Sequence, residues 1–339
     1  MSVFQIVSEI IIKALQEGVV PWRKPWRASH DVHQNLITRK PYRGINIWML
    51  SFQASLKGFQ SPYWITENQA RQKGGSIKSR PATIVVKYIP VGNKPSDDLV
   101  GSESTASHPH ESNHRLYPRY YRVYNVEQTE GLETLIPPPS PIVSSLPITE
   151  SEKIQRFNQI LENYPNPKPA LLYTGNRAFY SPHEDKVVVP KLENFSSWAE
   201  WAATNFHEFA HSSGHPTRLK RKGITNPSYF GSHTYSVEEL IAEMTSSFLA
   251  YDIGIFHEVS QNSAAYIDGW YRQVETKGFQ KVSDEEYCQG WIGALAKNHH
   301  LFFEAARQAE KAAEFILGRS LFENLENTEL DIDEGLWNL

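Results

Sequence analysis

Apolar residues recur at steps of three and four in several segments of the chain, the spacing that lines one face of an α-helix. In residues 2–17 this pattern fills the segment and stops at Gly18, a residue type that commonly follows the last turn of a helix. Further helices are expected over residues 45–56, 66–73 and 300–317. Helices are therefore predicted near both ends of the chain.

Other segments show the patterns of β-strands. Residues 82–89 alternate β-branched and other side chains, and residues 117–126 are rich in tyrosine and valine, so each is predicted to form a strand. Residues 178–180 and 186–189, separated by Ser-Pro-His-Glu-Asp, predict a hairpin that ends at Pro190. Together with the helices, these strands predict an α+β protein.

Two capping boxes mark the starts of helices in the second half of the chain. Thr149 is followed three residues later by Glu152, and Ser197 by Glu200, which is the reciprocal pattern in which each side chain bonds the other's backbone N–H. The helix that Ser197 opens is expected to run to Gly214.

Composition changes along the chain and indicates its organisation. A length of 339 residues is enough for roughly two domains. Residues 91–114 are polar and aperiodic, so they are expected to form a mobile insertion, and the proline-rich run at 136–141 is the best linker. The predicted parts are a first domain at 1–135, a linker at 136–148, a second domain at 149–320 and an acidic tail at 321–339.

Overall composition is that of a soluble, cytoplasmic protein without a membrane partner. Apolar residues make up 40% of the chain, and no apolar run approaches the roughly 18 residues that a membrane span needs. The first 20 residues carry Glu9, Lys13 and Glu17, where a signal peptide would have an uncharged core. The single cysteine, Cys288, excludes an internal disulfide and a cysteine-based zinc site, so any metal would need histidine and carboxylate ligands.

Charge is distributed unevenly along the chain. Residues 1–90 contain 13 Lys and Arg against four Asp and Glu, and the remainder contains 21 basic residues against 34 acidic ones. The chain is also rich in aromatic residues, with nine Trp, 16 Tyr and 16 Phe. A basic, aromatic front is typical of a module that faces nucleic acid, although a basic surface that merely interacts with solvent explains the charge alone equally well.

The helix opened by Ser197 carries the pattern His-Glu-x-x-His. His207 and His211 are four residues apart, so both imidazoles lie on one face of the helix and can bind a single Zn²⁺. Glu208 lies beside them, where it can accept a proton from water activated by the metal. Two histidines with ordinary structural roles in the helix are the alternative.

A catalytic zinc site needs a third protein ligand. The extended metzincin pattern requires a histidine at 217, where this chain has Thr217, so that class is excluded. Glu239 and Glu243 lie four apart in a downstream helix, and we expect Glu239 to bind the metal while Glu243 orients a histidine from outside the ligand set. Ser236 and Glu239 also form a capping box, which alone would explain Glu239.

Several longer motifs resemble the ArdC family of plasmid and phage antirestriction proteins. The motifs are Gly18-Val19-Val20-Pro21-Trp22-Arg23-Lys24-Pro25-Trp26, Tyr42-Arg43-Gly44-Ile45-Asn46, Tyr63-Trp64-Ile65-Thr66, Phe206-His207-Glu208-Phe209-Ala210-His211 and Glu238-Glu239-Leu240-Ile241-Ala242-Glu243. The resemblance implies an N-terminal α+β domain that binds single-stranded DNA and a C-terminal zincin-like metallopeptidase domain of the gluzincin type, loaded with Zn²⁺.

In that reading, tryptophans stack on unpaired bases and cations contact phosphates. Trp48 has apolar neighbours and is expected in the core instead. The expected DNA-binding residues are Trp22, Arg23, Lys24, Trp26, Arg27, Arg43, Trp64, Lys73, Lys78 and Arg80.

The resemblance also implies protection of incoming plasmid or phage DNA from host restriction. The peptidase would act on an unidentified protein or peptide, and a component of a restriction system is one option. Residues 186–189 are expected either to pair with an extended substrate as an edge strand or to support the helix as a buried strand. Three alternatives stay open: a metalloprotease that acts on DNA-bound proteins, a non-catalytic single-strand-binding protein with a structural zinc, and an acidic back half that mimics DNA.

Overall fold

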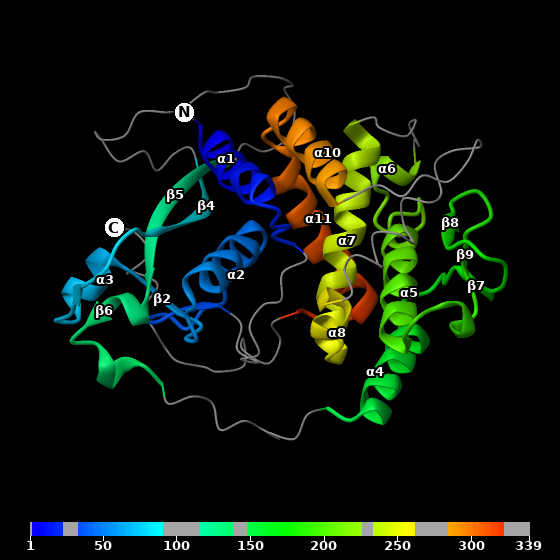
Figure 1. Ribbon diagram of the computed structural model, residues 1–339, viewed down its shortest axis with the longest axis horizontal. Helices are drawn as coiled ribbons and strands as arrows, with labels where there is room; N and C mark the ends of the chain where they lie inside the picture. Colours follow the sequence, from blue (N-terminus) through cyan, green and yellow to red (C-terminus); the bar gives the residue numbers. More distant parts are fainter. Residues whose placement is uncertain are drawn as a thin grey trace. The chain divides into compact units, whose positions relative to one another are not determined.

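The computed structural model describes residues 2–22, 33–90, 116–137, 148–225, 233–261 and 284–321, and they divide into two compact units (Figure 1). The N-terminal unit holds the described residues before Ser8 and those between Trp26 and Val143. The C-terminal unit holds Ser8 to Trp22 and the described residues from 148 onward. The division at Val143 falls inside the expected linker, but residues 8–22 belong to the C-terminal unit, unlike the expected domain at 1–135. The expected insertion at 91–114 and most of the tail at 321–339 lie outside the described residues.

The N-terminal unit is built on a four-stranded sheet in the order β1-β2-β5-β4. Its strands are β1 (Gln34–Asn35), β2 (Tyr63–Thr66), β4 (Thr83–Pro90) and β5 (Leu116–Asn125), with α2 (Ile45–Lys57) packed on β4. Short elements follow: α3 (Glu67–Gln72), β3 (Ser76–Ile77), η1 (Val126–Gln128), β6 (Thr129–Glu130) and η2 (Glu133–Leu135). β3 and β6 pair as a separate ribbon.

This unit has two core clusters, one between α2 and the sheet and one that includes Leu36, Ile65 and Leu132. Leu50 from α2 packs with Trp64, Val85 and Val123 from three strands, because alternate residues of each strand point toward the helix. The side chain of Thr66 accepts a hydrogen bond from the backbone N–H of Gln69 and so begins α3.

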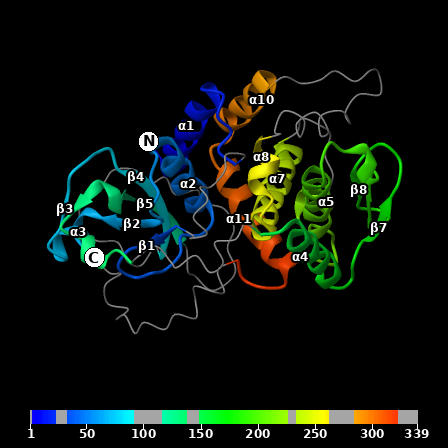
Figure 2. The ribbon, with the colours of Figure 1, turned by 60° about the horizontal axis from the view of Figure 1, so that its bottom comes forward.

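The C-terminal unit combines a helical layer with a small sheet. Its elements are most of α1 (Val3–Gln16), α4 (Glu150–Asn163), β7 (Ala170–Tyr173), β8 (Phe179–Ser181), β9 (Lys186–Val189), η3 (Leu192–Asn194), α5 (Trp198–Ser213), α6 (Lys222–Thr225), α7 (His233–Ile253), α8 (Phe256–Gln261), α10 (Asp284–Lys297) and α11 (Leu301–Leu317). Figure 2 shows α5 beside α7, with the sheet on the other side of α5, and α7 in turn contacts α11. No described helix is both long and apolar enough to cross a lipid bilayer.

Most predicted elements are present, and at two places the structure excludes one of the alternatives that the sequence leaves open. Strand β9 pairs with β7 on one side and β8 on the other, so Lys186–Val189 is the central strand of its sheet and offers no free edge. Helix α7 begins at His233, so Ser236 lies within the helix and does not cap it. Glu239 is therefore not explained as a capping residue.

Candidate metal centre

Helix α5 presents both histidines of the His-Glu-x-x-His pattern toward α7. The side chain of Ser197 accepts a hydrogen bond from the backbone N–H of Glu200 at 3.2 Å, which fixes the start of the helix. His207 and His211 are buried, and the centroids of their rings lie 4.6 Å apart. The local sequence thus places two imidazoles one helical turn apart, where both could bind one metal ion.

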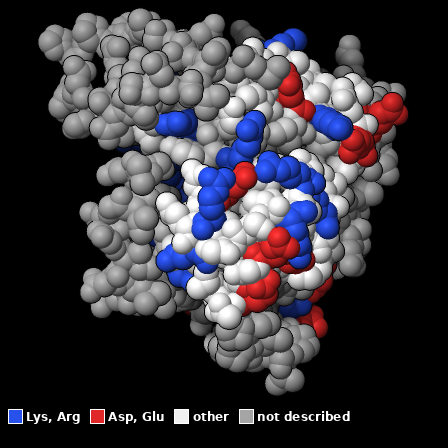
Figure 3. Space-filling model, turned by 90° about the vertical axis from the view of Figure 1, so that its left-hand side faces the viewer, with Lys and Arg blue, Asp and Glu red and all other residues white. Residues whose placement is uncertain are grey.

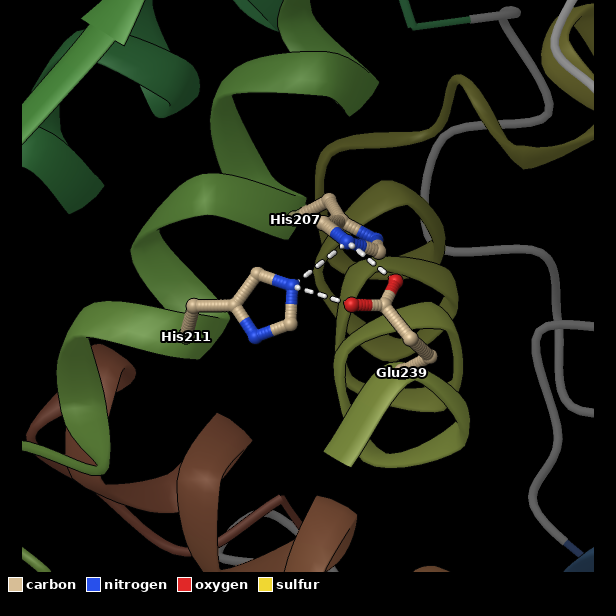
Figure 4. A group of neighbouring side chains, drawn as sticks. All are labelled: His207, His211 and Glu239. Atoms are coloured by element: carbon tan, nitrogen blue, oxygen red, sulfur yellow. Dashed lines mark hydrogen bonds and ion pairs between the residues drawn. The ribbon is translucent and has the colours of Figure 1, made fainter. Parts of the chain in front are cut away.

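Glu239 of α7 completes a three-residue cluster with the histidines (Figure 4). The Nε2 atoms of His207 and His211 are 2.9 Å apart, and each lies 3.6 Å from one carboxylate oxygen of Glu239. Two ligands at about 2.0–2.1 Å from one zinc ion in tetrahedral geometry are separated by about 3.3 Å. The three separations bracket that value, so this donor set fits a single divalent ion.

Glu208 adjoins the cluster but is not among its ligands. Its side chain is nearly fully buried, and burial, reinforced by the charge of Glu239, raises the pKa of Glu208 to about 8, against the opposing influence of His211. The backbone N–H of Tyr180, in strand β8, favours the charged form of this carboxylate and so opposes the rise in its pKa. A carboxylate with a raised pKa beside a metal site is suited to accept and return a proton.

Glu238 holds His211 from behind. One of its oxygens, Oε1, lies 3.3 Å from Nδ1 of His211. The guanidinium of Arg221 donates a hydrogen bond from Nη2 to the same oxygen at 2.6 Å. Burial lowers the pKa of His211, but the charges of Glu239 and Glu238 outweigh it and raise that pKa to about 9. A carboxylate bonded to the far nitrogen of a ligating histidine fixes its orientation, and here Glu238 has that position.

Glu243 has a different position from the one expected. Its carboxylate accepts a hydrogen bond of 2.9 Å from the indole nitrogen of Trp22, so the orienting role expected for Glu243 is corrected to Glu238. Trp22 is fully buried and packs against Trp291 and Phe302. This burial corrects the base-stacking role expected for Trp22 to a core role in the C-terminal unit.

Arg218 fixes strand β8 beside the site. Its side chain is 1% exposed and contacts both oxygens of Asp185, one of them at 3.0 Å, and the hydroxyl of Tyr180 at 3.1 Å. It also donates to the backbone oxygen of Ser212, near the end of α5, at 2.7 Å. The strand whose backbone reaches Glu208 is thereby attached to the helix that carries Glu208.

The expected DNA-binding residues are distributed unequally. Trp64 is fully buried, and its indole nitrogen donates a hydrogen bond to His33 at 3.1 Å. Its expected stacking role is therefore corrected to core packing. Trp48 is buried, as expected. Four of the expected cations are exposed on the N-terminal unit: Arg43, Lys73, Lys78 and Arg80. Arg23, Lys24, Trp26 and Arg27 lie outside the described residues.

Comparisons with known proteins agree with this architecture. A model of the N-terminal domain of the anti-restriction factor ArdC matches residues 1–126, and a model of zincin-like metallopeptidases matches residues 166–278. The crystal structure of the antirestriction protein ArdC from plasmid R388, in its Mn(II)-bound form, covers 97% of this chain and 100% of its own at 27% identity and a TM-score of 0.63. The N-terminal part of this chain thus matches the ArdC domain, and the chain as a whole is similar to the R388 ArdC structure. The expected two-domain class, with a zincin-like second domain, is confirmed.

Other proteins that are similar to this chain differ in length. The metal-free form of the R388 protein aligns at 28% identity, with a TM-score of 0.62 and the same coverage. Two Escherichia coli proteins named DNA primase TraC are each 29% identical over 92% and 86% of this chain, which spans only 26% and 20% of their lengths. Protein y4eC of Sinorhizobium fredii strain NGR234 is 27% identical over 86% of this chain and 92% of its own.

Proposed function

We propose that this chain is a zinc-dependent peptidase joined to a single-stranded-DNA-binding unit, and that it protects incoming plasmid or phage DNA from host restriction. The observation that carries the peptidase half is the cluster of His207, His211 and Glu239 with Glu208 buried beside it. The family match and the basic N-terminal unit support the DNA-binding half.

A divalent ion held by this cluster would supply Lewis acidity, polarising both water and the carbonyl of the peptide to be cleaved. Glu208 takes the proton of the attacking water on its carboxylate and then gives it to the leaving amide nitrogen. Its raised pKa of about 8 suits both transfers, because a group that accepts and returns a proton works best with a pKa near ambient pH. Glu238 and Arg221 keep His211 in its ligating orientation throughout.

In this proposal strand β8 pairs with the substrate, because Lys186–Val189 is the central strand of its sheet. Among the described strands, β8 pairs only with β9, and it lies against α5. An extended peptide that added to its other edge would pass close to Glu208, because the backbone of Tyr180 already contacts that carboxylate. Arg218 and Asp185 fix this strand before any substrate arrives.

A non-catalytic zinc protein is the alternative that the site disfavours. A structural site has four protein ligands and needs no proton acceptor, whereas here three ligand groups cluster and a buried carboxylate stands beside them. A protease that acts on DNA-bound proteins uses the same residues, and it differs only in its target.

The Glu208→Gln variant tests the mechanism. The amide keeps the shape of the side chain but cannot accept the proton, so we expect zinc binding to be retained while cleavage of labelled casein, with and without single-stranded DNA, falls by about 10²- to 10⁴-fold. Wild-type turnover in the zinc-loaded variant would contradict the proposed role, and Glu243→Gln is the matched control that keeps its activity.

A further inference from the structure

The hairpin of β4 and β5 has one face that does not pack on α2. The two strands are antiparallel, and Val85 lies opposite Tyr121 while Val86 lies opposite Tyr120. Val85 and Tyr121 belong to the apolar cluster under α2. Because successive side chains of a strand point to opposite faces, Tyr120 and its same-face neighbours point away from α2.

This outer face carries aromatic rings and cations. We define it by Tyr88, Tyr120 and Arg122, with Arg80 at its end, 5.7 Å from the ring of Tyr124, which is itself buried. Tyr88 is 46% exposed, Arg122 is exposed and Tyr120 is half-buried. Tyr88 is opposite Pro118 and therefore diagonal to Tyr120, a relation in which two aromatic side chains are near neighbours.

The surroundings of this face are rich in cations, although Glu67 is a neighbouring acid that pairs with Arg80 at 3.2 Å. Residues 68–90 and 116–126 contain seven Lys and Arg and no Asp or Glu. Figure 3 shows several Lys and Arg side chains around an uncharged area on one side of the molecule, with some Asp and Glu side chains among them. An excess of cations attracts an anionic ligand.

We propose that single-stranded DNA binds along the outer face, with bases stacked on Tyr88 and Tyr120 and phosphates paired with Arg122 and Arg80. This proposal rests on the DNA-binding half of the proposed function and names its surface. Exposed rings bind unpaired bases of any sequence, and flanking cations supply the salt-dependent part of the affinity. The outer face thus takes the base-stacking role that was expected for Trp22 and Trp64, whose rings are in the cores of the two units.

The test is the affinity of the full-length protein for a fluorescein-labelled oligo-dT, measured by anisotropy at several salt concentrations. Tyr120→Ala and Tyr88→Ala should each weaken binding by about 5- to 150-fold without changing the salt slope, because each removes a stacking platform. Tyr120→Phe should keep wild-type affinity because it keeps the ring. Arg122→Gln should lower the slope of log affinity against log salt by about 0.7, the contribution of one phosphate contact on a single strand.

Controls separate this surface from the proposed function as a whole. Lys191→Gln, an exposed cation of the C-terminal unit, should change neither affinity nor slope. If the wild type binds single strands while Tyr88→Ala and Tyr120→Ala, folded by circular dichroism, bind equally well, the surface is wrong and the DNA-binding function stands. If the wild type binds no single strand, or binds duplex equally tightly, both proposals are overturned.

Discussion

In the C-terminal unit charged side chains are buried in specific pairs, whereas in the N-terminal unit they lie outside the core and are mostly of one sign. Every buried charged side chain among the described residues belongs to the C-terminal unit, including Glu208, Arg221 and Glu238. The described residues 33–90 and 116–137 carry 11 Lys and Arg against four Asp and Glu.

This contrast follows from the cost of burying charge. A buried carboxylate or guanidinium needs a partner at short distance, so its position is fixed and it can fix others in turn. Exposed charges need no partner, contribute little individually and act through their sum on a charged ligand. The C-terminal unit is therefore built for chemistry at defined atoms, and the N-terminal unit for attraction along a surface.

The largest stability difference is expected between two arginines, one in each unit. Arg218→Met leaves Asp185 without its main partner in a mostly buried network, and we expect a loss of about 2 to 4 kcal/mol in the free energy of unfolding. Arg71→Met removes an exposed pair with Glu67, four residues earlier, and should cost less than about 0.5 kcal/mol. Urea denaturation measures both, and equal losses would remove the contrast between the units.

Metal affinity should be sensitive to the carboxylate behind His211. Glu238→Gln disrupts the charged link between Arg221 and His211, and we expect zinc affinity to fall by about 10- to 100-fold. Glu243→Gln, on the same helix, is the matched control and should leave zinc affinity unchanged. Competition with a zinc-binding dye gives both values, and the reverse order would restore the expected role of Glu243.

A smaller effect on the free energy of unfolding is expected when pH changes the charge of a histidine in the N-terminal unit. Burial lowers the pKa of His33 from 6.5 to about 4, against a hydrogen bond with the backbone of Pro62. Between these values the unfolded chain takes up a proton that the folded chain does not, so stability falls as pH falls from about 6.5 to 4. Because His33 is only half-buried by surface area, we expect the free energy of unfolding to fall by about 1 to 2 kcal/mol over this pH range, which is less than the full pKa shift would give.

His33→Gln should remove this part of the pH dependence, as measured by urea midpoints from pH 7 to pH 4. His183→Gln, in an exposed turn of the other unit, should follow the wild-type curve. If His33→Gln also follows the wild-type curve, His33 does not titrate as its burial implies.

Local patterns predicted the parts of the fold that depend on neighbouring residues. The pair His207 and His211 follows from four-residue spacing on one capped helix, and β4 and β5 follow from their side-chain composition. Strand β7 was not predicted, because its four residues are recognisable only by their parallel pairing with β9. That pairing also makes β9 central, which its own sequence does not reveal.

The errors at the site arise from contacts between distant segments. Trp22 stands among prolines and cations in the sequence, but its partner Glu243 is 221 residues away. The choice between Glu238 and Glu243 depends on where α7 begins and on Arg221, which lies in another segment. The adjacent pair Glu238-Glu239 was a usable signal, because two neighbouring carboxylates can serve one histidine and one metal ion.

The zinc affinity of Glu239→Ala, measured by calorimetry beside that of Glu243→Ala, decides which carboxylate completes the metal centre. We expect Glu239→Ala to lose at least about 100-fold in affinity, because it removes one of three proposed protein ligands, while Glu243→Ala binds zinc as the wild type does. Full zinc affinity in Glu239→Ala, with loss in Glu243→Ala, would contradict the assigned metal centre.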